Sequence, residues 1–108
     1  MTPTELLEAI EKHARKQGYE LNADREHLMM LMEGLLANEA RYGYRGCPCR
    51  LGKNDKEADR DIFCPCDYRD PDVEEFGSCY CGLYVSADWN EGKVEKVRVP
   101  ERRPMEKR

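Results

Sequence analysis

The sequence predicts a small, mainly α-helical domain. Two long amphipathic segments with helix-capping residues at both ends fill most of the first 43 residues, and two shorter helix signals follow between positions 54 and 77. The chain has 108 residues, and a domain of this length buries only about two-thirds of the surface of its unfolded chain. With 40% hydrophobic residues, the core is small.

The two long helices begin and end at clear signals. The segment Thr2–Glu5 matches a capping box with proline at the first helical position, and the helix is expected to run to Gly18. The segment Asn22–Arg25 begins the second helix, which is expected to end at Gly43. The apolar stripes are Leu6, Leu7, Ile10 and Ala14 in the first helix and Leu28, Met32, Leu35, Leu36 and Ala40 in the second.

Two shorter helices are predicted further along. Capping residues at 54–57 indicate a helix of about two turns that runs toward Phe63. Residues 70–77 read as another short helix that stops at a glycine.

A short C-terminal β-hairpin is also expected. Residues 83–85 and 94–99 are rich in strand-forming side chains, and residues 90–92 between them have the composition of a turn.

Charge is distributed unevenly along the chain. Residues 91–108 hold seven basic and four acidic side chains, so the first ninety residues carry −7 of a total net charge of −4. This balance gives little support to nucleic-acid binding. We expect the basic segment to be a solvated, partly frayed end; the alternative is that it attracts an acidic protein partner. Its basic residues are Lys93, Lys96, Arg98, Arg102, Arg103, Lys107 and Arg108.

Neither a membrane segment nor an export signal is visible. The chain has no stretch of about eighteen apolar residues, and its start is a polar, capped helix signal rather than a basic region followed by an apolar run. We therefore expect a soluble, cytoplasmic protein.

The chemistry of the chain is expected at its cysteines. All six lie within thirty-five residues as three Cys-x-Cys pairs: Cys47 and Cys49, Cys64 and Cys66, and Cys79 and Cys81. One tetrahedral metal or one four-iron cluster takes four thiolates, and two further thiols beside it can form a redox-active disulfide. The count therefore indicates four ligands plus one pair. Three structural disulfides are disfavoured, because no export signal is visible and the thiols are packed too regularly.

The cysteine pattern resembles the catalytic chain of the ferredoxin:thioredoxin reductase family, in which two Cys-Pro-Cys units precede a Cys-His-Cys unit. The flanking residues match over positions 22–86: Arg41–Gly43 before the first pair, Arg50 after it, Asp61–Phe63 before the second, and Gly82–Val85 after the third. Two features depart from the family. The gaps between the pairs are fourteen and twelve residues, and Tyr80 stands where the family usually has histidine.

The resemblance implies one multi-helical domain over residues 1–108, wrapped around a 4Fe-4S cluster, with the cluster region at 41–86. It implies that the cluster ligands are Cys47, Cys64, Cys66 and Cys79, and that Cys49 and Cys81 form the redox disulfide. The implied activity is a ferredoxin-dependent disulfide reductase. Ferredoxin would be the electron donor, and a thioredoxin-like protein or another disulfide would be the acceptor. A second subunit or a homo-oligomer is compatible with this prediction.

The resemblance also implies roles for two thiols and for the residue between the last pair. Cys49 would attack the target disulfide, and Cys81 would then attack Cys49 and release the reduced target. The family histidine is associated with proton movement, for which the phenol of Tyr80 is poorly suited because its pKa is near 10. His13 and His27 are the candidate replacements, although each is expected to be an ordinary surface or packing residue.

Two other functions remain open. A structural zinc protein would use four of the six thiols, but the Cys-x-Cys spacing is unlike that of common zinc sites. An electron carrier, or a cluster-bearing subunit, would keep the cluster while Cys49 and Cys81 stayed inert; the tyrosine at position 80 favours this alternative.

Overall fold

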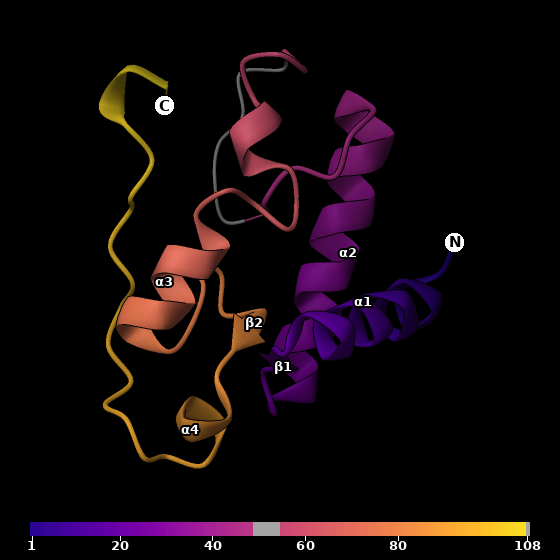
Figure 1. The fold of residues 1–108 in the computed structure, drawn as a ribbon. Coiled ribbons are helices and arrows are strands. Elements are labelled where there is room, and N and C mark those ends of the chain that lie inside the picture. The colour runs from indigo at the N-terminus through magenta and orange to yellow at the C-terminus, as the bar shows by residue number, and fades with distance from the viewer. Residues whose placement is uncertain (49–54, 108) are drawn as a thin grey trace.

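The computed structural model describes residues 1–48 and 55–107. Within them the chain forms four α-helices and one two-stranded antiparallel sheet (Figure 1). This confirms the predicted mainly α-helical class. None of the helices in the described part of the chain combines the length and hydrophobicity needed to cross a membrane.

Helix α1 (Pro3–Gln17) has the predicted ends. The Thr2 side chain accepts a hydrogen bond from the N–H of Glu5, the Glu5 carboxylate accepts one from the N–H of Thr2, and Gly18 ends the helix at φ 82°. Its apolar stripe packs against α2, which crosses it steeply in Figure 1. The buried residues of this face are Leu6, Leu7 and Ala14.

Helix α2 (Arg25–Tyr42) carries the chain to the first cysteine pair. The side chain of Asp24 caps its start by accepting from the N–H of His27 at 3.2 Å, and Gly43 ends it at φ 83°. Both boundaries agree with the prediction. Four residues of its inner face are buried: Leu28, Leu31, Met32 and Leu35.

Between the first two cysteine pairs, the predicted two-turn helix is wrong. Asn54 lies outside the described residues, and positions 56–59 form turns that lead into the single 3₁₀ turn η1 (Arg60–Ile62). The Asp55 carboxylate does accept from the N–H groups of Glu57 and Ala58, so the capping signal is real. The helix cannot continue, because Phe63 is drawn into an extended bridge with Gly46.

Helix α3 (Arg69–Phe76) follows the second pair and ends at Gly77, as predicted. It begins one residue before the expected start, and Tyr68 at its N-cap makes no capping side-chain bond. The short helix therefore depends on tertiary contacts made by its own side chains rather than on a strong cap.

The predicted C-terminal hairpin is wrong in its pairing. Strand β2 (Tyr84–Val85) exists, but its partner is β1 (Glu20–Leu21), near the N-terminus, with Glu20 opposite Val85. Residues 94–99 form no strand. After β2 the chain enters the short helix α4 (Ala87–Asn90), where the Asn90 side chain donates to the carbonyl of Leu21. This contact leads the chain away from the position a hairpin partner needs.

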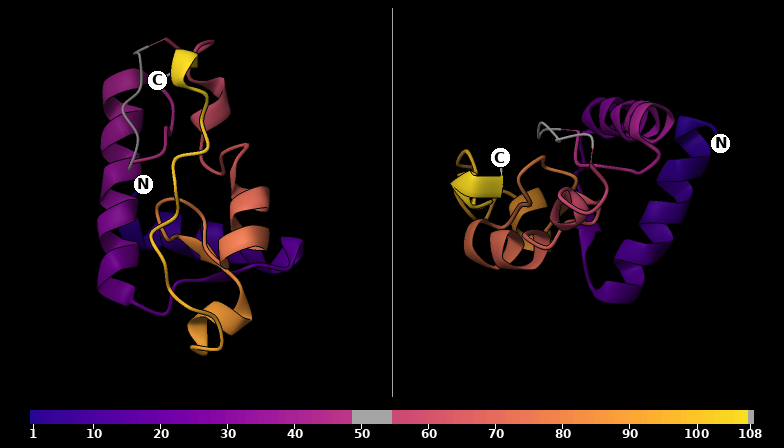
Figure 2. Two further views of the ribbon diagram at one scale, coloured as in Figure 1. Left: turned by 90° about the vertical axis from the view of Figure 1, so that its left-hand side faces the viewer. Right: turned by 90° about the horizontal axis from the view of Figure 1, so that it is seen from above.

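The C-terminal segment runs in extended form past α3 to the 3₁₀ turn η2 (Met105–Lys107) (Figure 2). Arg102 pairs with Asp72 and Glu75 of α3. Arg103 is 1% exposed and pairs with Asp59 at 3.4 Å and Asp61 at 2.9 Å. The expectation of a frayed end is therefore wrong at these two arginines, which bind this segment to the molecule, and the expectation of a solvated end is wrong at Arg103.

Candidate functional site

The cysteine pairs come together from three loops. Cys47 follows α2, Cys64 and Cys66 lie between η1 and α3, and Cys79 and Cys81 lie between α3 and β2. These five cysteines line one hollow, and they form no disulfide among themselves. The other residues that line it are Pro65, Arg69, Tyr80 and Tyr84. The structure thus brings together all the predicted site residues except Cys49, which lies outside the described residues.

The first two cysteine loops are bound to each other through their backbones. The N–H of Cys47 donates to the carbonyl of Ile62 at 2.8 Å, and the N–H of Cys64 donates to the carbonyl of Arg45 at 2.8 Å. The bridge between Gly46 and Phe63 lies between these bonds. Cys47 and Cys64 are therefore held in register by main-chain bonds that do not depend on their side chains.

Helix α2 positions the first loop. Asn38 donates to the carbonyl of Gly46 at 2.9 Å. One turn earlier, Gly34 faces Pro48 so closely that a Cβ at position 34 would lie 2.8 Å from the proline Cβ. The absence of a side chain at Gly34 is what allows the Cys-Pro-Cys loop to lie against the helix.

The third loop is a tight turn. The N–H of Gly82 donates to the carbonyl of Cys79 at 3.0 Å, and the sulfurs of Cys79 and Cys81 are 3.8 Å apart. The backbone N–H of Tyr84 lies 3.3 Å from the Cys79 sulfur and donates to it. His27 Nε2 lies 2.8 Å from the carbonyl oxygen of Cys81, which ties the turn to the first turn of α2.

The surroundings of the thiols shift the pKa values of Cys79 and Cys64 in opposite directions. The hydrogen bond between the Cys79 and Cys81 sulfurs and the N–H groups of Tyr84 and Leu83 lower the pKa of Cys79 below its ordinary value despite burial. Burial raises the pKa of Cys64 well above its ordinary value, and the thiolates of its cysteine neighbours raise it further. The guanidinium of Arg69 opposes this shift.

Several buried thiolates in one hollow therefore repel each other, and positive charge is needed to hold them ionised. Iron–sulfur clusters and soft metal ions supply that charge and favour thiolate ligands. The donor set thus fits a thiolate-ligated metal centre. No group of three or more His, Cys, Asp or Glu side chains within residues 1–48 and 55–107 is arranged as a site for a single metal ion.

Of the two histidines considered as replacements for the family histidine, only His27 reaches this region. It bonds to the backbone of Cys81, whereas His13 is exposed on α1. Tyr80 lines the hollow with the cysteines. Two arginines flank the first cysteine pair. Arg45 pairs with Glu39 at 2.6 Å, and Arg50 lies outside the described residues.

Three contributors were missed by the sequence prediction: Gly34, Asn38 and Arg69. Gly34 does have a signal in the sequence, because a glycine inside an amphipathic helix indicates close packing. Asn38 and Arg69 have no such signal.

A helical domain that gathers cysteines from three loops around one hollow belongs to the class of small proteins whose chemistry lies at clustered thiols. A sequence model of the family described as ferredoxin thioredoxin reductase catalytic beta chain matches residues 4–105. The chain belongs to this family. The family supports a function like that of ferredoxin–thioredoxin reductase, a disulfide oxidoreductase, and its members bind an iron–sulfur cluster. A search of curated proteins returned no significant match.

Proposed function

We propose that this protein is a ferredoxin-dependent disulfide reductase whose acceptor is the disulfide of a thioredoxin-like protein. The observation that carries this proposal is the convergence of five cysteines, from all three Cys-x-Cys pairs, on one hollow. Family membership supplies the class of reaction, and the cysteine arrangement supplies a place for it. The cytoplasm is the proposed compartment.

In this proposal a 4Fe-4S cluster is held by four of the thiolates. The ligands are Cys47, Cys64, Cys66 and Cys79. When bound, such a cluster accepts and donates single electrons. The protein shields the ligands: Cys47 is 4% exposed and Cys79 is 3% exposed. The main-chain bonds between the first two loops hold the backbones of the ligands in place, and the N–H of Tyr84 donates to the Cys79 sulfur and stabilises its negative charge.

The remaining pair, Cys49 and Cys81, performs thiol–disulfide exchange. The Cys49 thiolate attacks one sulfur of the target disulfide, the target bond breaks, and a mixed disulfide forms. The Cys81 thiolate then attacks the Cys49 sulfur, expels the reduced target as a dithiol after protonation, and restores the Cys49–Cys81 disulfide. Each turnover needs two electrons and two protons. Ferredoxin supplies the electrons one at a time.

The structure supports Cys81 as a member of this pair. Its sulfur lies 3.8 Å from the sulfur of Cys79, a proposed cluster ligand, so electrons travel only a short distance between ligand and redox thiol. Its carbonyl is held by His27 Nε2. The histidine contact fixes the backbone of the turn, so that the Cys81 side chain keeps its place beside Cys79.

The first test is chemical analysis of protein purified without oxygen. The proposal predicts about four irons and four sulfides per chain, the composition of the cluster type, with a visible spectrum that changes on reduction. One zinc and no sulfide would refute the cluster and favour a structural zinc protein. Reduced ferredoxin and an oxidised thioredoxin are then added. A loaded protein that does not form thioredoxin thiols would be an electron carrier.

Two variants test the separate roles of the cysteines. Cys49→Ser should retain iron and sulfide but lose disulfide turnover, because the attacking thiolate is absent. Cys64→Ser should lose or destabilise the cluster. Full turnover by the first variant would refute the nucleophile assignment, and an unchanged iron content and spectrum in the second would refute the ligand set.

A further inference from the structure

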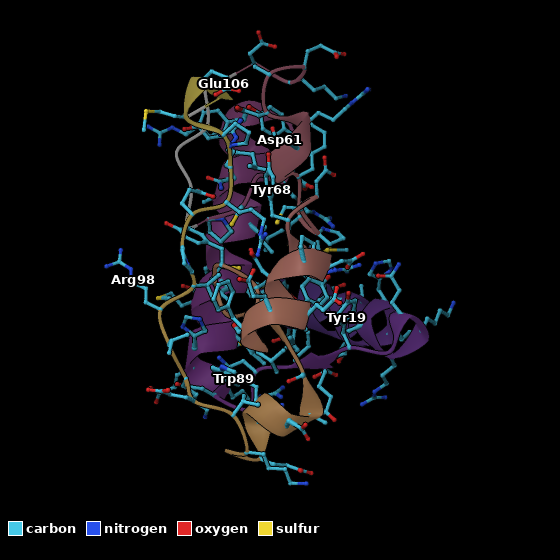
Figure 3. All side chains as sticks on the ribbon, turned by 60° about the vertical axis from the view of Figure 1, so that its left-hand side comes forward. Tyr19, Asp61, Tyr68, Trp89, Arg98 and Glu106 are labelled. Atoms are coloured by element: carbon cyan, nitrogen blue, oxygen red, sulfur yellow. The ribbon has the colours of Figure 1, made fainter. Side chains whose placement is uncertain are left out.

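Arg69 is a buried cation at the cysteine hollow. Its side chain is 8% exposed, and its guanidinium carbon lies 4.5 Å from the ring centre of Tyr19 and 4.7 Å from that of Tyr84. Nε donates to Asp70 at 3.0 Å, and Nη2 donates to the side-chain oxygen of Gln17 at 2.6 Å. The two rings and two hydrogen bonds fix the plane of the guanidinium. Tyr19 lies beside α3 in Figure 3.

The third nitrogen of the guanidinium, Nη1, makes neither of these two hydrogen bonds. Nη1 of Arg69 is buried and has no hydrogen-bond partner among the described residues. A buried N–H of a charged group that lacks a partner is costly, more so than that of a neutral group. The other buried arginine in the described chain does not share this feature: Arg103 donates to two carboxylates and a carbonyl.

The residue that carries this unpartnered nitrogen borders the cysteine hollow. Arg69 lines it together with the five described cysteines. The proposed cluster adds sulfur acceptors and negative charge to this space. Hydrogen bonds to the sulfurs and the net charge of the site are among the factors that set the reduction potential of an iron–sulfur cluster. A buried cation favours the state with one more electron, because Coulomb interactions are strong where water is excluded.

We propose that Arg69 raises the reduction potential of the bound cluster, with Nη1 donating to sulfur in the hollow and the guanidinium charge stabilising the reduced state. This inference rests on the proposed cluster. Arg69 is a positioning and tuning residue rather than an exchanging one. Tyr84 contributes in two ways, since its ring packs on Arg69 while its N–H donates to the Cys79 sulfur.

A planar guanidinium is suited to this role. Its five donors lie in a rigid fork, so Asp70 and Gln17 can hold two edges while the N–H groups of Nη1 stay available to a sulfur acceptor in the hollow. A lysine keeps the charge but has neither the fork nor the flat face that packs between two rings. Arg69→Lys and Arg69→Gln therefore separate the effect of geometry from that of charge.

The test is a redox titration of the cluster-loaded protein, followed by electron paramagnetic resonance. In Arg69→Gln the ratio of reduced to oxidised cluster at a given potential should fall at least tenfold, which is a shift of about 59 mV for one electron. Arg69→Lys should shift the potential less. The matched control is Arg98→Gln, which removes the same charge from an exposed side chain that projects away from the fold (Figure 3).

The outcomes are separable. A potential in Arg69→Gln equal to that of the control overturns the inference, since the charge then has no effect on the cluster. If Arg69→Gln does not retain the cluster, Arg69→Lys decides. A changed iron–sulfur stretching frequency in its resonance Raman spectrum supports the sulfur hydrogen bond, and an unchanged frequency and potential overturn it. Wild-type protein without iron and sulfide overturns the proposed function itself, and this is measured first.

A second control tests for a purely structural role. Asp70→Asn weakens the outer anchor of Arg69 without removing the charge at the hollow, since the Asp70 side chain is 70% exposed. Its cluster potential should stay near that of the wild type. A shift in Asp70→Asn as large as that in Arg69→Gln would assign the effect to a general loosening of α3 and would overturn the inference.

Discussion

Replacement of Gly34 by alanine tests how α2 positions the first cysteine loop. The added Cβ would lie 2.8 Å from the Cβ of Pro48, whereas carbon atoms pack favourably at about 3.5–4.0 Å. The loop that carries Cys47 therefore has to move away by about 1 Å. Such overpacking costs about 1–3 kcal/mol, and the better helix propensity of alanine offsets about 1 kcal/mol of it. We expect a net loss of about 1 kcal/mol.

The assay is thermal unfolding of the cluster-loaded protein, together with its iron content. For a domain of about this size, 1 kcal/mol shifts the unfolding midpoint by about 4–8 °C. Pro48→Gly supplies the matched background, because it removes the atom that the new Cβ meets. In that background Gly34→Ala should no longer destabilise, and the difference between the two backgrounds measures the contact. A raised midpoint with unchanged iron content for Gly34→Ala in the wild-type background would refute the reasoning.

Three further predictions concern Arg103, the tyrosines Tyr44 and Tyr68, and Gly82. Arg103→Met leaves buried carboxylates, including Asp61, without their cation and should cost about 3–5 kcal/mol in urea unfolding. Burial and hydrogen bonds to carboxylates raise the pKa of Tyr44 and of Tyr68 to about 12. Stability should therefore be complete below about pH 10, the pKa of an unfolded tyrosine, and fall as pH rises toward the folded values. Gly82→Ala places a side chain at φ 76°, a conformation that strains the turn. It should therefore loosen the turn and speed alkylation of the adjacent Cys81 in the reduced protein.

Each of these predictions has an outcome that contradicts it. For Arg103→Met it is an unfolding midpoint equal to that of Arg98→Gln, a loss of charge at the surface. For the tyrosines it is a urea midpoint that stays constant up to pH 12, or one that begins to fall well below pH 10. For Gly82→Ala it is an unchanged alkylation rate together with wild-type stability.

The local features of this fold could be predicted from the sequence. Helices α1 and α2 begin and end at signals carried by a few neighbouring residues, such as the capping box at Thr2–Glu5 and the glycines at 18 and 43. These signals act over one turn of chain, so they need no knowledge of the rest of the molecule. The three Cys-x-Cys pairs likewise indicated a shared thiolate site without coordinates.

Contacts between distant segments were decided only by the tertiary structure. The partner of β2 is β1 rather than residues 94–99. The sequence could not show this pairing, because a two-residue strand has too little pattern of its own to identify its partner. The basic segment is held by Arg102 and Arg103, whose carboxylate partners lie 27 to 44 residues away. Arg69 appears in the sequence as one more surface charge. Its burial between two tyrosines at the edge of the cysteine hollow follows from packing that joins α1, α3 and β2, and no local signal encodes that arrangement.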